Sequence, residues 1–177
     1  MIEQLATYAQ PVLEFPIIRR TRRNHALEHA TIHMLSRKNR RLRMAGRSSD
    51  NGFVLMGDVP TEQVQSAVED ALTRLGKGEH NWALHPNCGT NLVTTAILTT
   101  SAGMIGLRSG YNVLDRFTWT MMLMILALLV SQPLGMSLQK HITTKADPGD
   151  LELVKITRRE IKFPIHMIMH HVVTRRG

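Results

Sequence analysis

Two histidines and a glutamate are spaced so that they could act on one metal ion. They belong to the run His25-Ala26-Leu27-Glu28-His29, and at about 100° per residue His25, Glu28 and His29 share one face of a helix. Two imidazoles one turn apart can bind one ion, and His-x-x-Glu-His is the reverse of the zincin motif, whose glutamate polarises the attacking water. The pattern therefore predicts His25 and His29 as metal ligands and Glu28 as a general base. The same spacing also arises by chance on solvated helices.

A second run of metal-binding residue types, His85-Pro86-Asn87-Cys88, follows later in the chain. An imidazole and a thiolate favour zinc among the common ions, so His85 and Cys88 are candidate ligands and zinc is the expected cofactor. The competing interpretation is that the run only turns the chain and begins a helix, with Cys88 a small packed residue. If the two runs meet, three protein ligands plus water would form an open catalytic site, whereas four would form a closed structural one. The sequence leaves both open.

The other histidines carry weaker expectations. His33 continues the first series but lies about 80° around the helix, so we expect it to support a ligand or to be exposed. His166, His170 and His171 lie near a basic end of the chain without an accompanying acid, which favours a solvated or membrane-facing position over a ligand role.

The elements that must position these residues combine helices and strands. A helix is predicted over 25–36 with Asn24 as its N-cap, and the apolar spacing of 61–75 predicts an amphipathic helix. An Asn-Gly pair between the candidate strands 43–49 and 53–56 predicts a β-hairpin.

The middle of the chain contains two stretches without charged residues, 90–107 and 117–138, each long enough to cross a hydrocarbon core of about 30 Å. The loop between them carries Arg108 and Arg116, while the flanks carry the other basic residues. By the positive-inside rule we expect a multi-pass protein of the cell membrane with both termini cytoplasmic. The competing interpretation is a buried helical hairpin in a soluble protein, which the Thr, Asn and Ser content of the first stretch favours.

Together these patterns predict an α+β membrane protein, with a small cytoplasmic domain of helices and strands and a two-helix transmembrane hairpin. The expected parts are a cytoplasmic part over 1–89, the hairpin over 90–138, and a cytoplasmic part over 139–177 that holds a strand at 151–156 and a basic tail. Cys88 is the only cysteine, so the sequence excludes an intrachain disulfide and a disulfide-bonded secreted scaffold.

At its two motifs the chain resembles the YqhQ-like proteins, a family of bacterial membrane proteins of unknown function with a predicted metal dependence. The matching stretches run from His25 to His33 (HALEHATIH) and from His85 to Thr90 (HPNCGT), followed by hydrophobic segments. A smaller uncharacterised family, with the motifs H-A-L-E-H-A-T and H-P-x-C-G-T-N, is similar over the whole chain. The resemblance implies a membrane protein with a metal site, and it implies no substrate. The site residues that it implies are His25, Glu28, His29, His85 and Cys88.

The function that these observations favour is a zinc-dependent hydrolase, peptidase-like, acting at the cytoplasmic membrane surface. In this hypothesis His25 and His29 bind the ion. Either His85 or Cys88 completes the protein ligands, and Glu28 is the general base. The alternative is a non-catalytic membrane protein in which a structural metal joins the first helix to the loop before the membrane, and the sheet region binds a protein partner. Glu28 separates the two, because a catalytic base matters for turnover and not for metal content.

The expected partners follow from charge and composition. Ten Lys and Arg residues lie between Arg19 and Arg47, which indicates contact with membrane lipid. This stretch has no Phe, Tyr or Trp on which bases could stack, and that argues against nucleic acid. A membrane protein or a peptide is the expected substrate. The small-residue spacing Ala102, Gly106, Gly110 permits close helix packing within the hairpin or between copies in a homo-oligomer.

Overall fold

The structure of the chain is a computed structural model that describes residues 2–39, 41–162 and 166–177. The chain divides into two compact units. One consists of residues 1–85 and 140–177, and the other of residues 86–139. Each unit has its own architecture.

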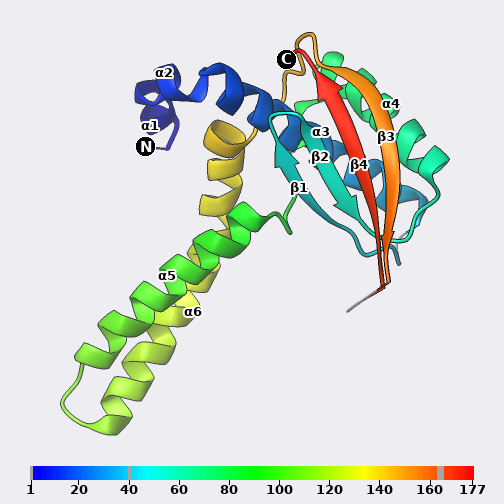
Figure 1. Ribbon diagram of the computed structural model, residues 1–177. Coiled ribbons are helices and arrows are strands. Elements are labelled where there is room, and N and C mark those ends of the chain that lie inside the picture. The colour runs from blue at the N-terminus through cyan, green and yellow to red at the C-terminus, as the bar shows by residue number, and fades with distance from the viewer. Residues whose placement is uncertain (1, 40, 163–165) are drawn as a thin grey trace. The chain divides into compact units, whose positions relative to one another are not determined.

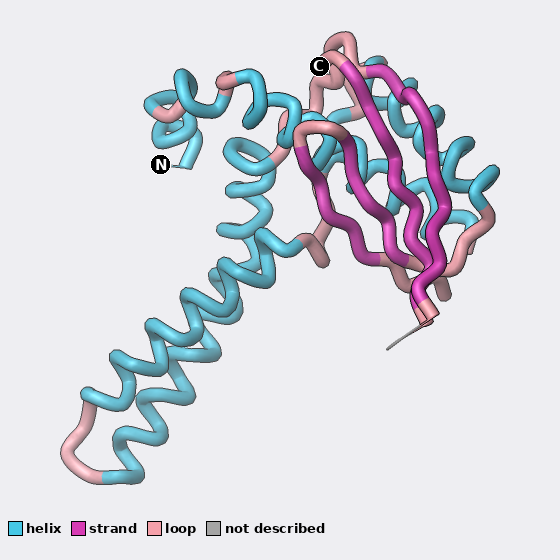
Figure 2. The backbone as a smooth tube through the Cα atoms, viewed as in Figure 1, coloured by secondary structure: helices cyan, strands magenta, loops and turns pink. Residues whose placement is uncertain are grey.

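An antiparallel sheet forms one layer of the first unit. Among the described residues its strands are β1 (Ala45–Ser49), β2 (Gly52–Met56), β3 (Glu152–Ile161) and β4 (Met167–Arg175), in the order β1-β2-β4-β3 (Figure 2). β1 and β2 form the predicted hairpin, with Ser49 opposite Gly52. Gly52 has a φ of 136°, a conformation that favours glycine. β4 then pairs with β2 on one side and β3 on the other, so late residues complete a sheet that early residues begin.

The helices α3 (Pro16–Lys38) and α4 (Thr61–Gly76) form the second layer of this unit. Two short helices, α1 (Ile2–Tyr8) and α2 (Gln10–Leu13), precede α3, and a short 3-10 helix, η1 (His80–Ala83), packs against α3 and α4. α3 contacts β1 and β2, α4 contacts β3, and the two helices pack against each other on one face of the sheet (Figure 1).

The hydrophobic core lies between these layers and fixes α3 on the sheet. Burying one such side chain stabilises the fold by about 1.5–3 kcal/mol. The largest fully buried apolar side chains come from α3, β2, α4 and β4: Leu27, Leu35, Leu55, Val64, Val68, Leu75 and Val172.

α3 begins earlier than predicted, because Pro16 and not a capping Asn24 opens it. Asn24 lies inside the helix, fully buried. Its amide donates to the Ser49 carbonyl at 2.9 Å, and its Oδ1 accepts from the Thr174 hydroxyl at 2.7 Å. The predicted cap is wrong, since this side chain bonds the sheet and not a helix N–H.

The second unit is a pair of helices, α5 (Gly89–Arg108) and α6 (Val113–Leu138), which run side by side (Figure 2). Gly106 lets the backbones approach closely, since a Cβ there would lie 2.3 Å from the Thr120 Cα. At the other end of the helix pair, Nε2 of Gln139 donates to Oδ1 of Asn91 at 2.8 Å. α6 continues into a π-helical turn, η2 (Gln139–Thr143), that leads back to the first unit.

The prediction of a transmembrane hairpin is wrong. Within the described residues, a single helical segment, Val113–Thr143, has the length and mean hydropathy of a membrane span, and 11% of its most apolar window is buried. α5 does not qualify, because polar residues such as Thr95, Thr99 and Ser101 recur along it. The fold class is α+β, helices with a four-stranded antiparallel sheet in the described part of the chain. The predicted multi-pass membrane location, with both termini cytoplasmic, is wrong as well, because it requires two spans.

Candidate metal centre

The first motif lies in the middle of α3, on a buried part of the helix. His25 and His29 stand one turn apart, with ring centroids 4.3 Å from each other. Their neighbours Ala26, Leu27 and Ala30 are fully buried in the core, so the rotation of α3 about its axis is fixed. The helix therefore holds both imidazoles in one place without a loop's freedom.

Backbone carbonyls fix the tautomers of both rings. Nδ1 of His29 donates to the Ala83 carbonyl at 2.7 Å, and Nδ1 of His25 donates to the Thr143 carbonyl at 3.0 Å. A carbonyl oxygen can only accept, so Nδ1 carries a proton in both rings and Nε2 is the nitrogen that would bind a metal. A ring N–H donated to a carbonyl is typical of histidines that bind a metal through the other nitrogen.

Glu28 points from α3 toward β1. It is only 4% exposed, and the Ser48 hydroxyl donates to its Oε2 at 2.5 Å. Burial raises the pKa of Glu28, while the bond from Ser48 and the charge of His25 oppose the rise. Gly46, two residues before Ser48, makes room for the carboxylate, because a Cβ there would lie 2.1 Å from Oε1.

His85 and His33 stand beside the first pair. The His85 ring centroid is 5.7 Å from that of His29 and 4.9 Å from that of His33. Burial, with the charges of His33 and His29, lowers the pKa of His85 to about 4, so its imidazole is neutral at pH 7. Nε2 of His33 donates to the Leu84 carbonyl at 2.8 Å, so His33 is partly buried against the loop before His85.

Cys88 follows His85 by three residues, so the covalent chain itself keeps the thiol near the histidines. It is buried, and as the N-cap of α5 its sulfur accepts from the Thr90 N–H at 3.4 Å. The ligand atoms of His25, His29 and Cys88 all lie within 4.8 Å of one another. This buried group could hold a metal ion. His85 is not a member of it.

Sequence reasoning missed Gly46 and Ser48, which hold the Glu28 carboxylate. The sequence indicates only that two small residues, two positions apart, face the same side of a strand. It does not indicate which side chain of the protein packs against them. Sequence reasoning also placed His170 in a solvated or membrane-facing position, and this is wrong. His170 is fully buried on β4, 3.4 Å from the Thr61 hydroxyl, and burial lowers its pKa. His166 is exposed and pairs with Glu160.

Comparison with known proteins places the chain in a family. The model of the domain of unknown function DUF6391 matches residues 20–156, which include both motifs. A protein of Picosynechococcus sp. (strain ATCC 27264 / PCC 7002 / PR-6), described as uncharacterised, is 35% identical over 147 residues, covering 76% of this chain and 70% of that protein. No solved structure matches the chain. The expectation of an uncharacterised family is confirmed, while the YqhQ-like name stays a prediction. The chain belongs to the DUF6391 family.

Proposed function

We propose that the protein is a zinc-dependent hydrolase, peptidase-like, with His25, His29 and Cys88 as ligands and Glu28 as general base. The observation that carries the proposal is the buried group of two imidazoles and one thiol, whose ligand atoms lie within 4.8 Å of one another. Nitrogen and sulfur donors are typical of zinc sites, and a tetrahedral ion with three protein ligands keeps one position for water.

Zinc at this place would lower the pKa of a water molecule to about 7 and polarise a substrate carbonyl. Residues of the chain itself orient the side chains that this chemistry needs. The carbonyls of Ala83 and Thr143 hold the two imidazoles in the tautomer with the lone pair on Nε2. Ser48 orients the Glu28 carboxylate, and we assign this carboxylate to take the proton of the attacking water and to return it to the leaving amine.

The environment of Glu28 supports this assignment. Burial raises the pKa of Glu28, against the bond from Ser48 and the charge of His25, and a raised pKa makes a carboxylate a better proton acceptor. The bond from Ser48 attaches the carboxylate to β1 and so orients it.

The alternative is a structural metal site without catalysis. It is favoured by the burial of the group, since His29 and Cys88 are only 2% and 7% exposed. A closed structural zinc site has four protein ligands. His85, whose ring centroid lies 5.7 Å from that of His29, is a candidate for the fourth, and it lies outside the group in which all ligand atoms are within 4.8 Å.

The test is hydrolysis of a quenched fluorescent peptide library by zinc-loaded protein, with Glu28→Gln as the decisive variant. Glutamine keeps the shape of the side chain and can still bond Ser48, but it cannot take a proton. We expect the variant to retain zinc and to lose turnover by about 10²–10⁴-fold. Glu62→Gln, on the exposed surface of α4, is the matched control and is expected to keep both.

Two results would contradict the proposal. One is hydrolysis that Glu28→Gln leaves at the wild-type rate. The other is a zinc-loaded wild-type protein that cleaves no peptide in the library, which would favour the structural alternative.

A further inference from the structure

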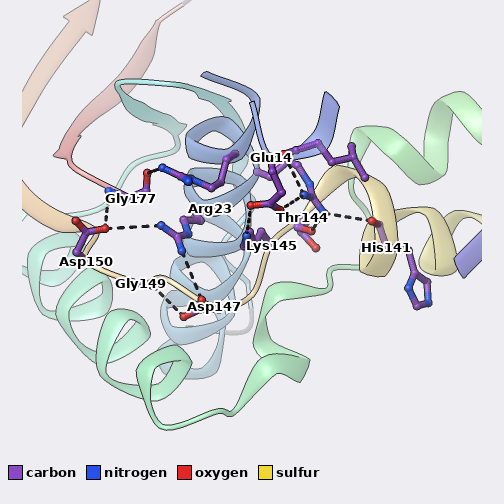
Figure 3. Close-up of polar contacts among 12 residues, drawn as sticks. Glu14, Arg23, His141, Thr144, Lys145, Asp147, Gly149, Asp150 and Gly177 are labelled. Carbon is purple, nitrogen blue, oxygen red and sulfur yellow. Dashed lines mark hydrogen bonds and ion pairs between the residues drawn. The ribbon is translucent and has the colours of Figure 1, made fainter. Parts of the chain in front are cut away.

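A buried arginine lies three residues before His25, on the same side of α3. Arg22 is 9% exposed, and its guanidinium is directed into the protein. Nη1 donates to the Leu13 carbonyl at 3.3 Å, and Nη2 donates to the carbonyls of His141 and Thr144, both at 3.2 Å. Figure 3 shows these contacts around His141 and Thr144. The arginine therefore joins α3 to a segment more than a hundred residues away.

The bound segment is the π-helical turn η2 and the residue that follows it, both in the first unit. The last carbonyls of a helix have no partner within the helix, so they need donors from elsewhere. Arg22 supplies the donors for His141 and Thr144, and Nδ1 of His25 supplies the donor for Thr143 between them. In return, the Arg22 carbonyl accepts from the Lys145 N–H at 3.1 Å. The end of the π-helical turn is thus capped by two residues of α3.

We propose that Arg22 is a positioning residue for His25. Arg22 bonds the carbonyls of His141 and Thr144, which lie on either side of Thr143 in the sequence. It thereby holds the Thr143 carbonyl in place, and this carbonyl is the acceptor that keeps the His25 proton on Nδ1 and leaves Nε2 for the metal. The inference rests on the proposed metal site, and it adds a residue that is not one of the proposed ligands.

Arginine suits this task better than lysine. The planar guanidinium offers five N–H donors in a fixed fork, and here one side chain serves three carbonyls. A positive charge is also favourable at the C-terminal end of a helix, where the helix dipole is negative. Glu14 lies 3.5 Å from Nη1 and balances the charge.

Arg23, the next residue, provides a matched control. Its side chain is 11% exposed, as is that of Arg22. It pairs with Asp147 at 3.5 Å and Asp150 at 3.7 Å, past the segment that accepts from His25 (Figure 3). Removing Arg23 therefore perturbs the same region of the fold without moving the Thr143 carbonyl.

The experiment compares Arg22→Met, Arg22→Lys and Arg23→Met in the full chain. Zinc affinity is measured by competition with a chromophoric chelator. The His25 tautomer is read from long-range ¹H–¹⁵N spectra of the metal-free protein, assigned with His25→Gln. We expect Arg22→Met to weaken zinc binding about 10–100-fold and to lose the Nδ1–H form of His25. Arg22→Lys should recover part of both, and Arg23→Met should change neither, whatever its melting temperature.

Several results would overturn the proposed role of Arg22. Wild-type zinc affinity and an intact His25 tautomer in folded Arg22→Met would overturn the inference, as would equal losses in Arg22→Met and Arg23→Met. If Arg22→Met does not fold, Arg22→Lys decides, because wild-type values in that variant also overturn it. A wild-type protein that binds no zinc contradicts the proposed function, and the tautomer measurement then still tests the role of Arg22.

Discussion

Gly46 and Ser48 show how much of the candidate site depends on residues with little chemistry of their own. Both lie on the side of β1 that faces α3, where the Glu28 carboxylate is buried. Ser48 orients the carboxylate by donating to it, and Gly46 leaves the space that the carboxylate occupies. The general base is therefore defined by a strand as much as by its own helix.

Replacing Gly46 with alanine should displace Glu28. The added Cβ would lie 2.1 Å from Oε1, so the carboxylate must move and lose the bond from Ser48. We expect a loss of about 1–3 kcal/mol in the free energy of unfolding, measured by urea denaturation. Gly76→Ala is the control, because no atom lies within 4 Å of a Cβ at the end of α4. Equal stability of the two variants would contradict this packing.

His85 tests whether the site has three protein ligands or four. Its ring lies 5.7 Å from that of His29, and it is outside the group of mutually close ligand atoms. We therefore expect His85→Ala to keep stoichiometric zinc, as measured by mass spectrometry, while Cys88→Ala loses it. Loss of zinc in both variants would indicate a closed site with four ligands and would favour the structural alternative.

At the scale of single residues, the sequence could predict the candidate ligands and the candidate base but not the residues that orient them. His25, Glu28, His29 and Cys88 are recognisable because their types and local spacing suit a metal. The acceptors for His29 and His25 are backbone carbonyls 54 and 118 residues away, and every residue has a carbonyl. Only the fold can select which of them is used.

Close helix packing defines the second unit at the scale of elements. The backbones of α5 and α6 approach closely where Gly106 meets Thr120. Gly106→Val should force the helices apart and destabilise this unit by about 1–3 kcal/mol. The measurement is the fluorescence of Trp119 on α6 during denaturation, in a Trp82→Phe background because Trp82 lies in the first unit. Gly103→Ala is the matched control, since its nearest atom, the Met124 sulfur, is at an ordinary contact distance of 3.5 Å. An unchanged denaturation midpoint in Gly106→Val would contradict the observed packing.

An ion pair joins the α2–α3 connection to the segment after the π-helical turn. The Lys145 ammonium bonds Glu14 at 2.6 Å and lowers the pKa of Glu14, with burial opposing and the charges of Arg22 and Arg19 assisting. The stabilisation is therefore complete above pH 4.5, the ordinary pKa of Glu, and is lost as the pH falls through the lowered pKa.

Glu14→Gln should remove this acid-dependent part of the stability. The contribution is about 1 kcal/mol or less, because the Glu14 side chain is 36% exposed. The measurement is the difference in urea midpoint between pH 6 and pH 3, which should be smaller in the variant than in the wild type. Glu62→Gln serves as the control, and identical differences in Glu14→Gln and the wild type would show that the pair contributes nothing.

The elements that sequence reasoning found and missed differ in their inward-facing residues. The predicted amphipathic helix 61–75 agrees with α4, whose buried face is consistently apolar. β4 was missed, although its residues alternate in burial, because two of the inward side chains, His170 and Thr174, are polar. These two bond Thr61 and Asn24, partners that local patterns do not reveal.

The whole molecule joins segments from both ends of the chain around one sheet. β2 pairs with β4, which places Gly52 opposite Val173. Residues 86–139, which lie between these two strands in the sequence, form a separate unit. The mixture of helices and strands was predictable from local periodicity. The strand order was not, because it depends on contacts between distant parts of the chain. The transmembrane hairpin was wrong because an absence of charge is not enough: α5 is uncharged over 90–107 but has many polar residues.

The central claim is that His25, His29 and Cys88 together bind a metal ion. The most direct test is the zinc content of the purified, zinc-supplied protein, measured by mass spectrometry for the wild type and His29→Ala, with the exposed His80→Ala as control. We predict about one zinc ion per chain in the wild type and in His80→Ala, and none in His29→Ala. A wild-type protein without zinc, or a His29→Ala variant that retains it, would contradict the account.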